Sequence, residues 1–138
     1  MKISLIAATF AALALTTAAN ADDIKDGKKE FNKCKACHAI KSDTGEDIVK
    51  GGKVGPNLYG IVGKAVASTE DFKYGDGLKA VGETGMVWTP EELEVYMTDP
   101  TAWIDEKLGD TKAKSLMTHK QKKKQEEIVA FLESVVTE

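Results

Sequence analysis

Apolar residues near the C-terminal end of the chain recur at the spacing of one helix face. Between residues 122 and 136, the positions i, i+3, i+4 and i+7 of this face are Ile128, Phe131, Leu132 and Val135. Such spacing is typical of an α-helix that buries one side in a core. The pattern therefore predicts an amphipathic helix from about residue 122 to residue 136.

A second helix is predicted over residues 22–35, where Ile24 and Phe31 lie seven positions apart. Asp22 and Asp23 open it, and their charge suits the positive end of the helix dipole. Gly27 lowers the stability of a helix interior, so we expect the helix to pack closely against a neighbour at that point.

Two further helices are predicted around the prolines of the C-terminal half. Thr89 can cap a helix that begins at Pro90, and Glu92 stands where a capping box requires it. Leu93, Tyr96 and Met97 then share a face, and the helix should end before Pro100. A short helix can follow, over residues 99–104.

The middle of the chain, residues 39–85, is rich in Gly, Lys and Asp and is expected to consist mainly of loops and turns. No segment alternates convincingly between apolar and polar residues as a strand would. The predicted class is therefore all-α with long loops. A structureless stretch of this length is uncommon in a compact domain, so something must hold it in place.

The N-terminal residues have the pattern of an export signal. Lys2 precedes an apolar stretch from Ile3 to Leu15, and Ala19-Asn20-Ala21 is a small-x-small cleavage site. The apolar stretch is shorter than a usual membrane span, although an uncleaved anchor is the alternative. We expect residues 1–21 to be removed and residues 22–138 to form one exported domain.

Charge excludes one class of partner. The chain carries 22 acidic residues against 19 basic ones, all of them lysines, for a net charge of −3. A nucleic-acid-binding domain would be dominated by basic charge, so nucleic acid is not an expected ligand.

Reactive side chains are most concentrated in the segment Lys33-Cys34-Lys35-Ala36-Cys37-His38, which contains both cysteines and one of the two histidines. A disulfide between the cysteines would close a very small loop and stabilise little. A thioredoxin-like redox pair belongs near a βαβ pattern, which is missing from this sequence, and zinc would need more ligands than His119 can add. C-x-x-C-H is the attachment signature of c-type haem, and this hypothesis is the strongest.

The spacing of the motif suits that chemistry. Two intervening residues let one turn present both thiols to the vinyl groups on one porphyrin edge, and the adjacent His38 then lies beneath the iron. A covalently bound haem would also give the loop-rich chain an apolar body on which to fold.

Four residues are candidates for the second axial ligand of the iron. Met97 belongs to an apolar helix face and Met86 precedes Trp88 after a turn, so packing is the better interpretation of both. Met117 lies among polar residues before the last helix and has no apolar partners at helical spacing to explain it. It is the favoured ligand, and His119 is its rival.

His38 and Met117 together would leave no open position on the iron. Such a haem exchanges single electrons, and Met/His ligation raises its reduction potential. Two rival functions remain at this point. One is a haem enzyme or gas sensor with an open iron, and the other is a haem-free, disulfide-bonded interaction module.

Several motifs in order along the chain are more specific than C-x-x-C-H alone. They are Gly55-Pro56-Asn57-Leu58-Tyr59-Gly60, Phe72-Lys73-Tyr74, Trp88, Tyr96-Met97-Thr98-Asp99-Pro100 and the Met117 loop. With these motifs the chain resembles the class I c-type cytochromes, most closely the bacterial cytochrome c2 group. The resemblance implies the class I cytochrome c fold, with N- and C-terminal helices packed together and loops wrapping one haem c.

The resemblance also implies roles for individual residues. Pro56 would accept a hydrogen bond from the His38 ring through its carbonyl. Tyr74 and Trp88 would donate to a haem propionate, with Ser115 as a further donor on that side. Tyr96 would lie near the Met117 sulfur.

Two positions depart from the family pattern. Lys64 stands where an arginine often reaches a propionate. His119 stands where an aromatic residue often covers the haem edge.

The implied function is that of a monomeric, periplasmic electron carrier. Its partners would be the quinol–cytochrome c oxidoreductase (the cytochrome bc1 complex) as donor and a photosynthetic reaction centre or terminal oxidase as acceptor. Lysines gathered in sequence around the proposed haem face would steer docking. They are Lys33, Lys35, Lys53, Lys112, Lys114, Lys120 and Lys122-Lys123-Lys124.

Overall fold

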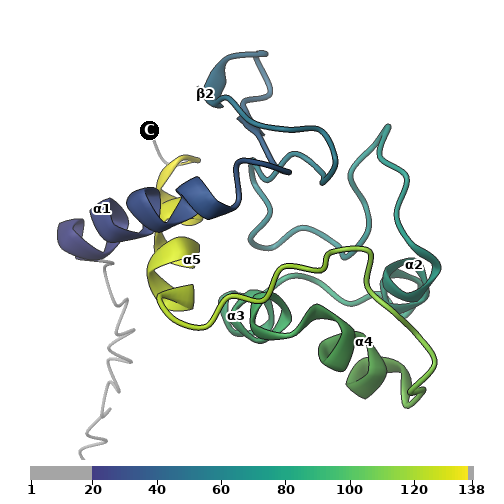
Figure 1. Cartoon of the computed structure of the whole chain (residues 1–138). Coiled ribbons are helices and arrows are strands. Elements are labelled where there is room, and N and C mark those ends of the chain that lie inside the picture. Colours follow the sequence, from purple (N-terminus) through teal and green to yellow (C-terminus); the bar gives the residue numbers. More distant parts are fainter. Residues whose placement is uncertain (1–19, 137–138) are drawn as a thin grey trace, which may run out of the picture.

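The computed structural model describes residues 20–136, and most of the predicted export signal lies outside this range. The described residues form five α-helices, a 3₁₀ turn and one short hairpin (Figure 1). The helices are α1 (Ala21–Glu30), α2 (Asp76–Glu83), α3 (Pro90–Thr98), α4 (Pro100–Leu108) and α5 (Gln125–Ser134). No helix within the described range is long and apolar enough to cross a membrane.

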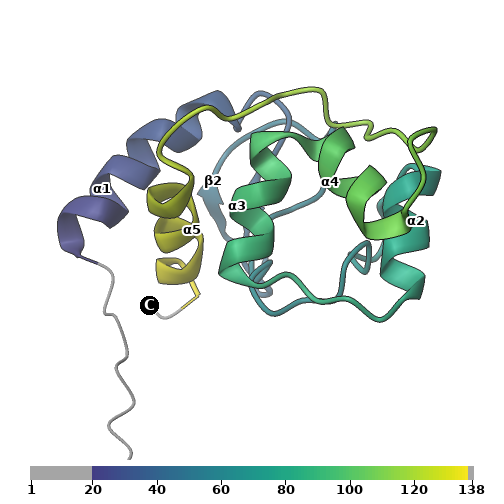
Figure 2. The same cartoon turned by 90° about the horizontal axis from the view of Figure 1, so that it is seen from below.

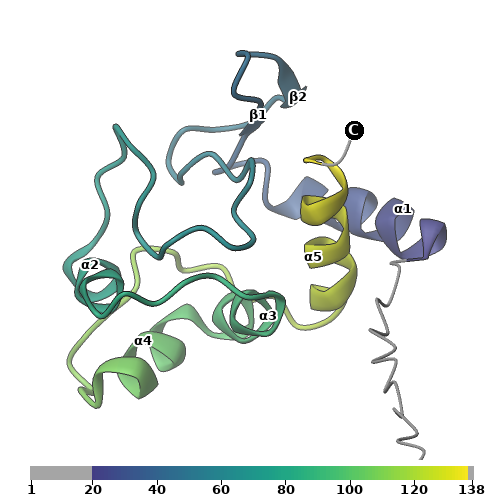
Figure 3. The same cartoon turned by 180° about the vertical axis from the view of Figure 1, so that it is seen from behind.

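The pairing of α1 with α5 brings the two ends of the described chain together, and the two helices cross in Figure 3. Phe31, in the 3₁₀ turn η1 (Phe31–Lys33) after α1, meets Phe131 edge to face, with ring centroids 5.7 Å apart. Gly27 faces the α5 backbone so closely that a Cβ at this position would lie 1.8 Å from the Glu127 carbonyl oxygen. The close contact expected at Gly27 is therefore confirmed.

Helices α3 and α4 begin at the residues that their sequences predict. The Thr89 hydroxyl accepts from the Glu92 N–H at 3.2 Å with Pro90 in the first position, and Asp99 caps α4 in the same way at Ala102. Helix α4 continues to Leu108, beyond the expected end at residue 104, and stops at Gly109 in the left-handed conformation. Figure 2 shows α2, α3 and α4 side by side on one part of the molecule.

Two elements differ from the sequence interpretation of residues 39–85. Strands β1 (Ile40–Lys41) and β2 (Asp47–Val49) form a small antiparallel hairpin, and α2 was expected to be loop. The glycines of α2 suggested turns, but they permit close packing. A Cβ on Gly82 would lie 2.5 Å from the Val66 carbonyl oxygen. Tertiary packing thus overrides weak helix propensity here.

The buried core joins α1, α3, α4 and α5 to the loops. Its largest fully buried side chains include Trp103, Phe31, Ile40, Ile104 and Ile128. The segments between β2 and α2 and between α4 and α5 remain long loops, as Figure 1 shows.

Gly27→Ala should lower the free energy of unfolding by about 3 kcal/mol, because the new methyl group forces α1 away from α5. Denaturant unfolding of the purified protein measures the loss. Lys28→Ala, at the exposed next position of α1, is the matched control and should change stability by at most about 0.5 kcal/mol. Equal effects of the two substitutions would show that the helix contact is not tight.

Candidate functional site

The two cysteines lie in the turn that follows η1. The Cys37 and His38 N–H groups both donate to the Cys34 carbonyl, at 3.1 and 2.9 Å. Both thiols are free, with Cys34 partly buried and Cys37 exposed. Burial raises the pKa of the Cys34 thiol to about 11, and the nearby Glu30 carboxylate adds to the effect. One turn therefore presents two separate thiols and an imidazole, and no disulfide joins them.

The His38 ring is oriented by a hydrogen bond from its Nδ1 to the Pro56 carbonyl, at 2.8 Å. A carbonyl oxygen can only accept, so Nδ1 carries the proton and Nε2 has a free lone pair. Burial lowers the pKa of His38, and the bond to Pro56 partly opposes this shift. The ring is thus neutral and ready to bind a metal through Nε2.

The loop before Pro56 lies directly against the histidine. A Cβ on Gly55 would come within 2.3 Å of the His38 ring, at Cε1. Backbone bonds hold this loop to the cysteine turn, since Gly52 donates to Lys35 and Gly55 donates to Cys37, at 2.9 and 2.8 Å. The close approach explains why this stretch is rich in glycine.

Met117 lies on a loop fixed by Ser115. The Met117 N–H donates to the Ser115 hydroxyl at 3.0 Å, and the Tyr96 hydroxyl is 3.2 Å from the same oxygen. Ser115 in turn donates through its N–H to Thr101 at 3.2 Å. Met117 is partly buried against the core, so its position is set by three segments of the chain. Burial raises the pKa of Tyr96, so its hydroxyl stays protonated.

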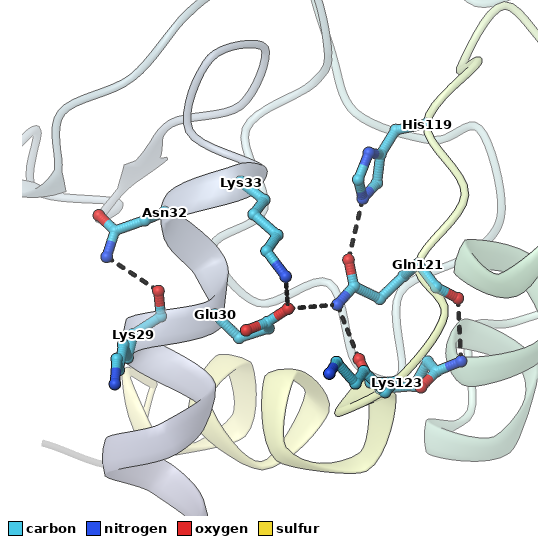
Figure 4. Close-up of polar contacts among 8 residues, drawn as sticks. Lys29, Glu30, Asn32, Lys33, His119, Gln121 and Lys123 are labelled. Carbon is cyan, nitrogen blue, oxygen red and sulfur yellow. Dashed lines mark hydrogen bonds and ion pairs between the residues drawn. The ribbon is translucent and has the colours of Figure 1, made fainter.

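The other ligand candidates have structural explanations. Met97 is buried in the core, and Met86 packs against it. His119 directs its Nε2 to the Gln121 Oε1 at 2.9 Å. Figure 4 shows this ring turned toward Gln121. An amide oxygen can only accept, so the His119 Nε2 carries the proton and is engaged in this bond.

Gln121 is a residue that the sequence interpretation missed. It is 3 % exposed, and its amide donates to Glu30 at 2.8 Å and to the Lys123 carbonyl at 2.7 Å (Figure 4). Glu30 also pairs with Lys33. Gln121 thus ties the loop before α5 to the end of α1. A single polar residue before a lysine run carries no sequence signal for this role.

Tyr74 and Trp88, the expected propionate donors, both have a hydroxyl or N–H left to donate. The Tyr74 oxygen accepts from the Thr69 N–H at 3.2 Å, which leaves its own hydrogen available. The Thr69 hydroxyl is buried and without a partner among the described residues. Trp88 is 4 % exposed, and no described residue accepts from its indole N–H. A tyrosine hydroxyl and an indole N–H normally find an acceptor, so both residues could donate to an anionic group.

The zinc alternative does not fit the structure. Within residues 20–136, no cluster of three or more His, Cys, Asp or Glu side chains could hold a metal ion. One histidine, one methionine and two free thiols on a loop-rich frame instead match the chemistry of a covalently held haem.

Three of the proposed docking lysines are in ion pairs. Lys33 pairs with Glu30, Lys120 with Asp99 at 2.6 Å, and Lys124 with Asp26 at 2.8 Å and Glu127 at 3.0 Å. Their charges are therefore partly compensated within the molecule.

Similarity to known proteins decides the family. The chain is 54 % identical over 135 residues to cytochrome c-550 of Paracoccus versutus, a match that covers 96 % of this chain and 88 % of that protein. It is 52 % identical over 136 residues to cytochrome c2 of Rhodobacter capsulatus, covering 99 % of each. The chain belongs to the cytochrome c2 group of class I c-type cytochromes.

Solved structures of this group share the fold. The X-ray structure of ferric cytochrome c-550 from Paracoccus versutus matches with a TM-score of 0.81 and 54 % identity, covering 83 % of this chain and 98 % of that one. Cytochrome c2 from Rhodobacter capsulatus matches equally well, with a TM-score of 0.81 and 49 % identity over 83 % and 98 % of the two chains. No family profile matches the chain.

Membership confirms the class I cytochrome c fold. As a member of the cytochrome c2 group, the chain is an electron-transfer protein rather than an enzyme, and it carries one covalently bound haem c.

Ser115→Ala should make the Met117 amide hydrogen exchange with solvent about tenfold faster, because it removes a hydrogen bond of about 1.4 kcal/mol. Hydrogen exchange followed by NMR measures the rate. Thr118→Ala, at an exposed position of the same loop, should leave that rate unchanged. A normal Met117 rate in the serine variant would mean that Ser115 does not fix the loop.

Proposed function

We propose that this cytochrome is a periplasmic carrier of single electrons between membrane complexes. It would take electrons from the quinol–cytochrome c oxidoreductase, the cytochrome bc1 complex, and deliver them to a photosynthetic reaction centre or a terminal oxidase. The observation that carries the proposal is the cysteine turn with its adjacent His38, whose ring is fixed by Pro56 with Nε2 left free.

In the proposed site, Cys34 and Cys37 form the two thioether bonds to the haem. His38 binds the iron through Nε2, and Met117 binds it through its sulfur. The haem supplies a one-electron couple. The hydrogen bond from His38 to Pro56 fixes the tautomer and increases the basicity of the ligand, as a carbonyl partner does in other metal sites.

The surrounding polar residues complete the proposed site. Tyr74 and Trp88 donate to a propionate. The free hydroxyl hydrogen of Tyr74 and the free indole N–H of Trp88 support this role. Tyr96 and Ser115 hold the Met117 loop through the hydroxyl pair at 3.2 Å. That bond favours a positioning role for Ser115, in addition to the propionate contact that the resemblance implies.

A pair of strong protein ligands supports a carrier rather than a haem enzyme or sensor. With both sides of the iron taken, oxygen or peroxide has no position to bind. Rigid placement of the two ligands also keeps structural change small when an electron arrives or leaves. His38 is held by Pro56, and Met117 by Ser115.

Met117→Leu should abolish the weak far-red sulfur-to-iron band of the ferric protein and let cyanide bind readily at neutral pH. Leucine conserves the volume, so folding should survive. Met97→Leu and Met86→Leu are matched controls that should keep the band, and His119→Gln should keep it as well. Visible spectra of the purified proteins, recorded with and without cyanide, show whether the band is lost and whether cyanide binds. Persistence of the band in Met117→Leu would assign the sulfur to another methionine.

For docking, we propose that the lysines of the Met117 loop and its surroundings form the contact face. Lys112, Lys114, Lys122 and Lys123 have exposed side chains and make no ion pair with a described residue. Free cationic charge of this kind steers a carrier toward acidic docking sites and increases its association rate.

Lys114→Glu should slow association with purified quinol–cytochrome c oxidoreductase by about threefold at low ionic strength, and the difference should shrink as salt screens the charges. Stopped-flow reduction kinetics over a salt series measure the rate. Lys79→Glu, on α2, makes the same change in net charge and is the control. Equal slowing by both variants would show that only net charge matters.

We also propose export to the periplasm, with residues 1–21 as a cleaved signal and residues 22–138 as the mature monomer. The lysine, apolar stretch and small-x-small site at the N-terminus support the proposal.

A further inference from the structure

Glu92 does not do what its position in the sequence suggests. It stands at the third position of α3, where a glutamate normally returns to the backbone of the capping residue. The Thr89 hydroxyl accepts from the Glu92 N–H as in a capping box, but the Glu92 carboxylate makes its hydrogen bonds to other residues. It accepts from the Trp103 indole N–H at 2.6 Å and from the Lys107 ammonium at 2.8 Å. This carboxylate therefore binds a buried side chain on the next helix.

Trp103 is the largest fully buried side chain of the described chain, at 1 % exposure. Its ring stacks on that of Trp88 with centroids 4.9 Å apart and planes 24° from parallel. Tyr96 meets both rings edge to face, at 4.9 Å from Trp88 and 5.3 Å from Trp103. The orientation of Trp88 therefore depends on the two aromatic rings packed against it.

Only Trp103 of these two neighbours is anchored by a charge. Hydrogen bonds to a carboxylate are about twice as strong as neutral ones, so Glu92 fixes the Trp103 plane firmly. Trp88 has no such anchor, because no described residue accepts from its indole N–H. A contact chain thus runs from Glu92 through Trp103 to Trp88.

Lys107 compensates the charge of this anchor. Its ammonium pairs with Glu92 and also lies 5.7 Å from the centre of the Trp103 ring. Hydrogen bonding to Lys107 holds the pKa of Glu92 below its usual range, so the carboxylate stays ionised at neutral pH. A paired carboxylate exerts a weaker field at a distance than a bare one, because the ammonium charge opposes it.

We propose that Glu92 is a positioning residue for the redox centre, acting through Trp103 on the direction in which Trp88 donates its indole hydrogen. The inference rests on the proposed role of Trp88 as a propionate donor. When Trp88 donates well, it partly neutralises a negative charge near the iron and disfavours the oxidised form. When the anchor is lost, Trp88 donates less well and the reduction potential falls.

Two substitutions of the same residue separate position from charge. Glu92→Gln removes the charge but keeps an amide oxygen that can accept from Trp103. Glu92→Leu removes both. A direct charge effect would raise the potential equally in the two variants. If Glu92 acts by positioning Trp88, the reduction potential of Glu92→Leu should be lower than that of Glu92→Gln. The expected difference is about threefold in the one-electron equilibrium constant, which corresponds to about 28 mV.

Spectroelectrochemical titration of the purified haem-loaded variants measures these potentials. Glu91→Leu and Glu91→Gln, at the exposed neighbouring position of α3, are matched controls and should not differ from each other. Equal potentials in the two Glu92 variants would overturn the inference.

NMR provides a second readout that needs no redox change. The chain has two tryptophans, so two indole N–H signals are expected. In Glu92→Leu both signals should shift, and the Trp88 indole hydrogen should exchange faster. In Glu92→Gln only the Trp103 signal should shift. A Trp88 signal that is the same in both variants would also overturn the inference.

Trp88→Phe distinguishes failure of the inference from failure of the proposed site. Phenylalanine keeps a ring against Trp103 but has no hydrogen to donate. A lower potential in this variant supports the role of Trp88 as a donor. The role of Glu92 is then tested separately by the potentials of Glu92→Gln and Glu92→Leu. An unchanged potential would overturn the role of Trp88 and, with it, the inference that depends on it.

Discussion

The hydrogen bond from the His38 ring to the Pro56 carbonyl is the constraint on which the site depends. It fixes the tautomer, the direction of the free ring nitrogen and the distance between the cysteine turn and the following loop. Backbone bonds from Gly52 and Gly55 to the same turn extend this connection. A loop that would otherwise be free is thereby attached to the end of α1.

The loop of the proposed ligand Met117 is held by polar contacts of the same kind. Ser115 joins the Met117 loop to Tyr96 on α3 and to Thr101 on α4. Gln121 joins the same loop, further along, to Glu30 at the end of α1. The helices thus serve as a frame to which the loops are fastened by single polar residues. This arrangement suits a carrier, whose haem ligands must stay in place in both redox states.

An aromatic cluster joins Trp88, a proposed propionate donor, to a partly exposed ion pair. Trp88, Tyr96 and Trp103 contact one another, and Glu92 with Lys107 closes the cluster on its outer side. An ion pair about a quarter exposed to solvent contributes little to stability by itself. Here it orients a buried indole, so its effect is structural and local.

The sequence by itself determined the covalent chemistry and the helical frame. The C-x-x-C-H motif lies within one turn, and the apolar stripe of α5 lies within three turns. The start of α3 is set by Thr89 and Pro90. Each of these features can be recognised from the sequence because it depends on residues close together in the chain. The tertiary structure alone decided the partners of Glu92, Gln121 and the ion-paired lysines, and it turned a glycine-containing stretch into α2. Those outcomes depend on which groups folding brings within hydrogen-bond or van der Waals distance across many residues, and no local pattern encodes that proximity.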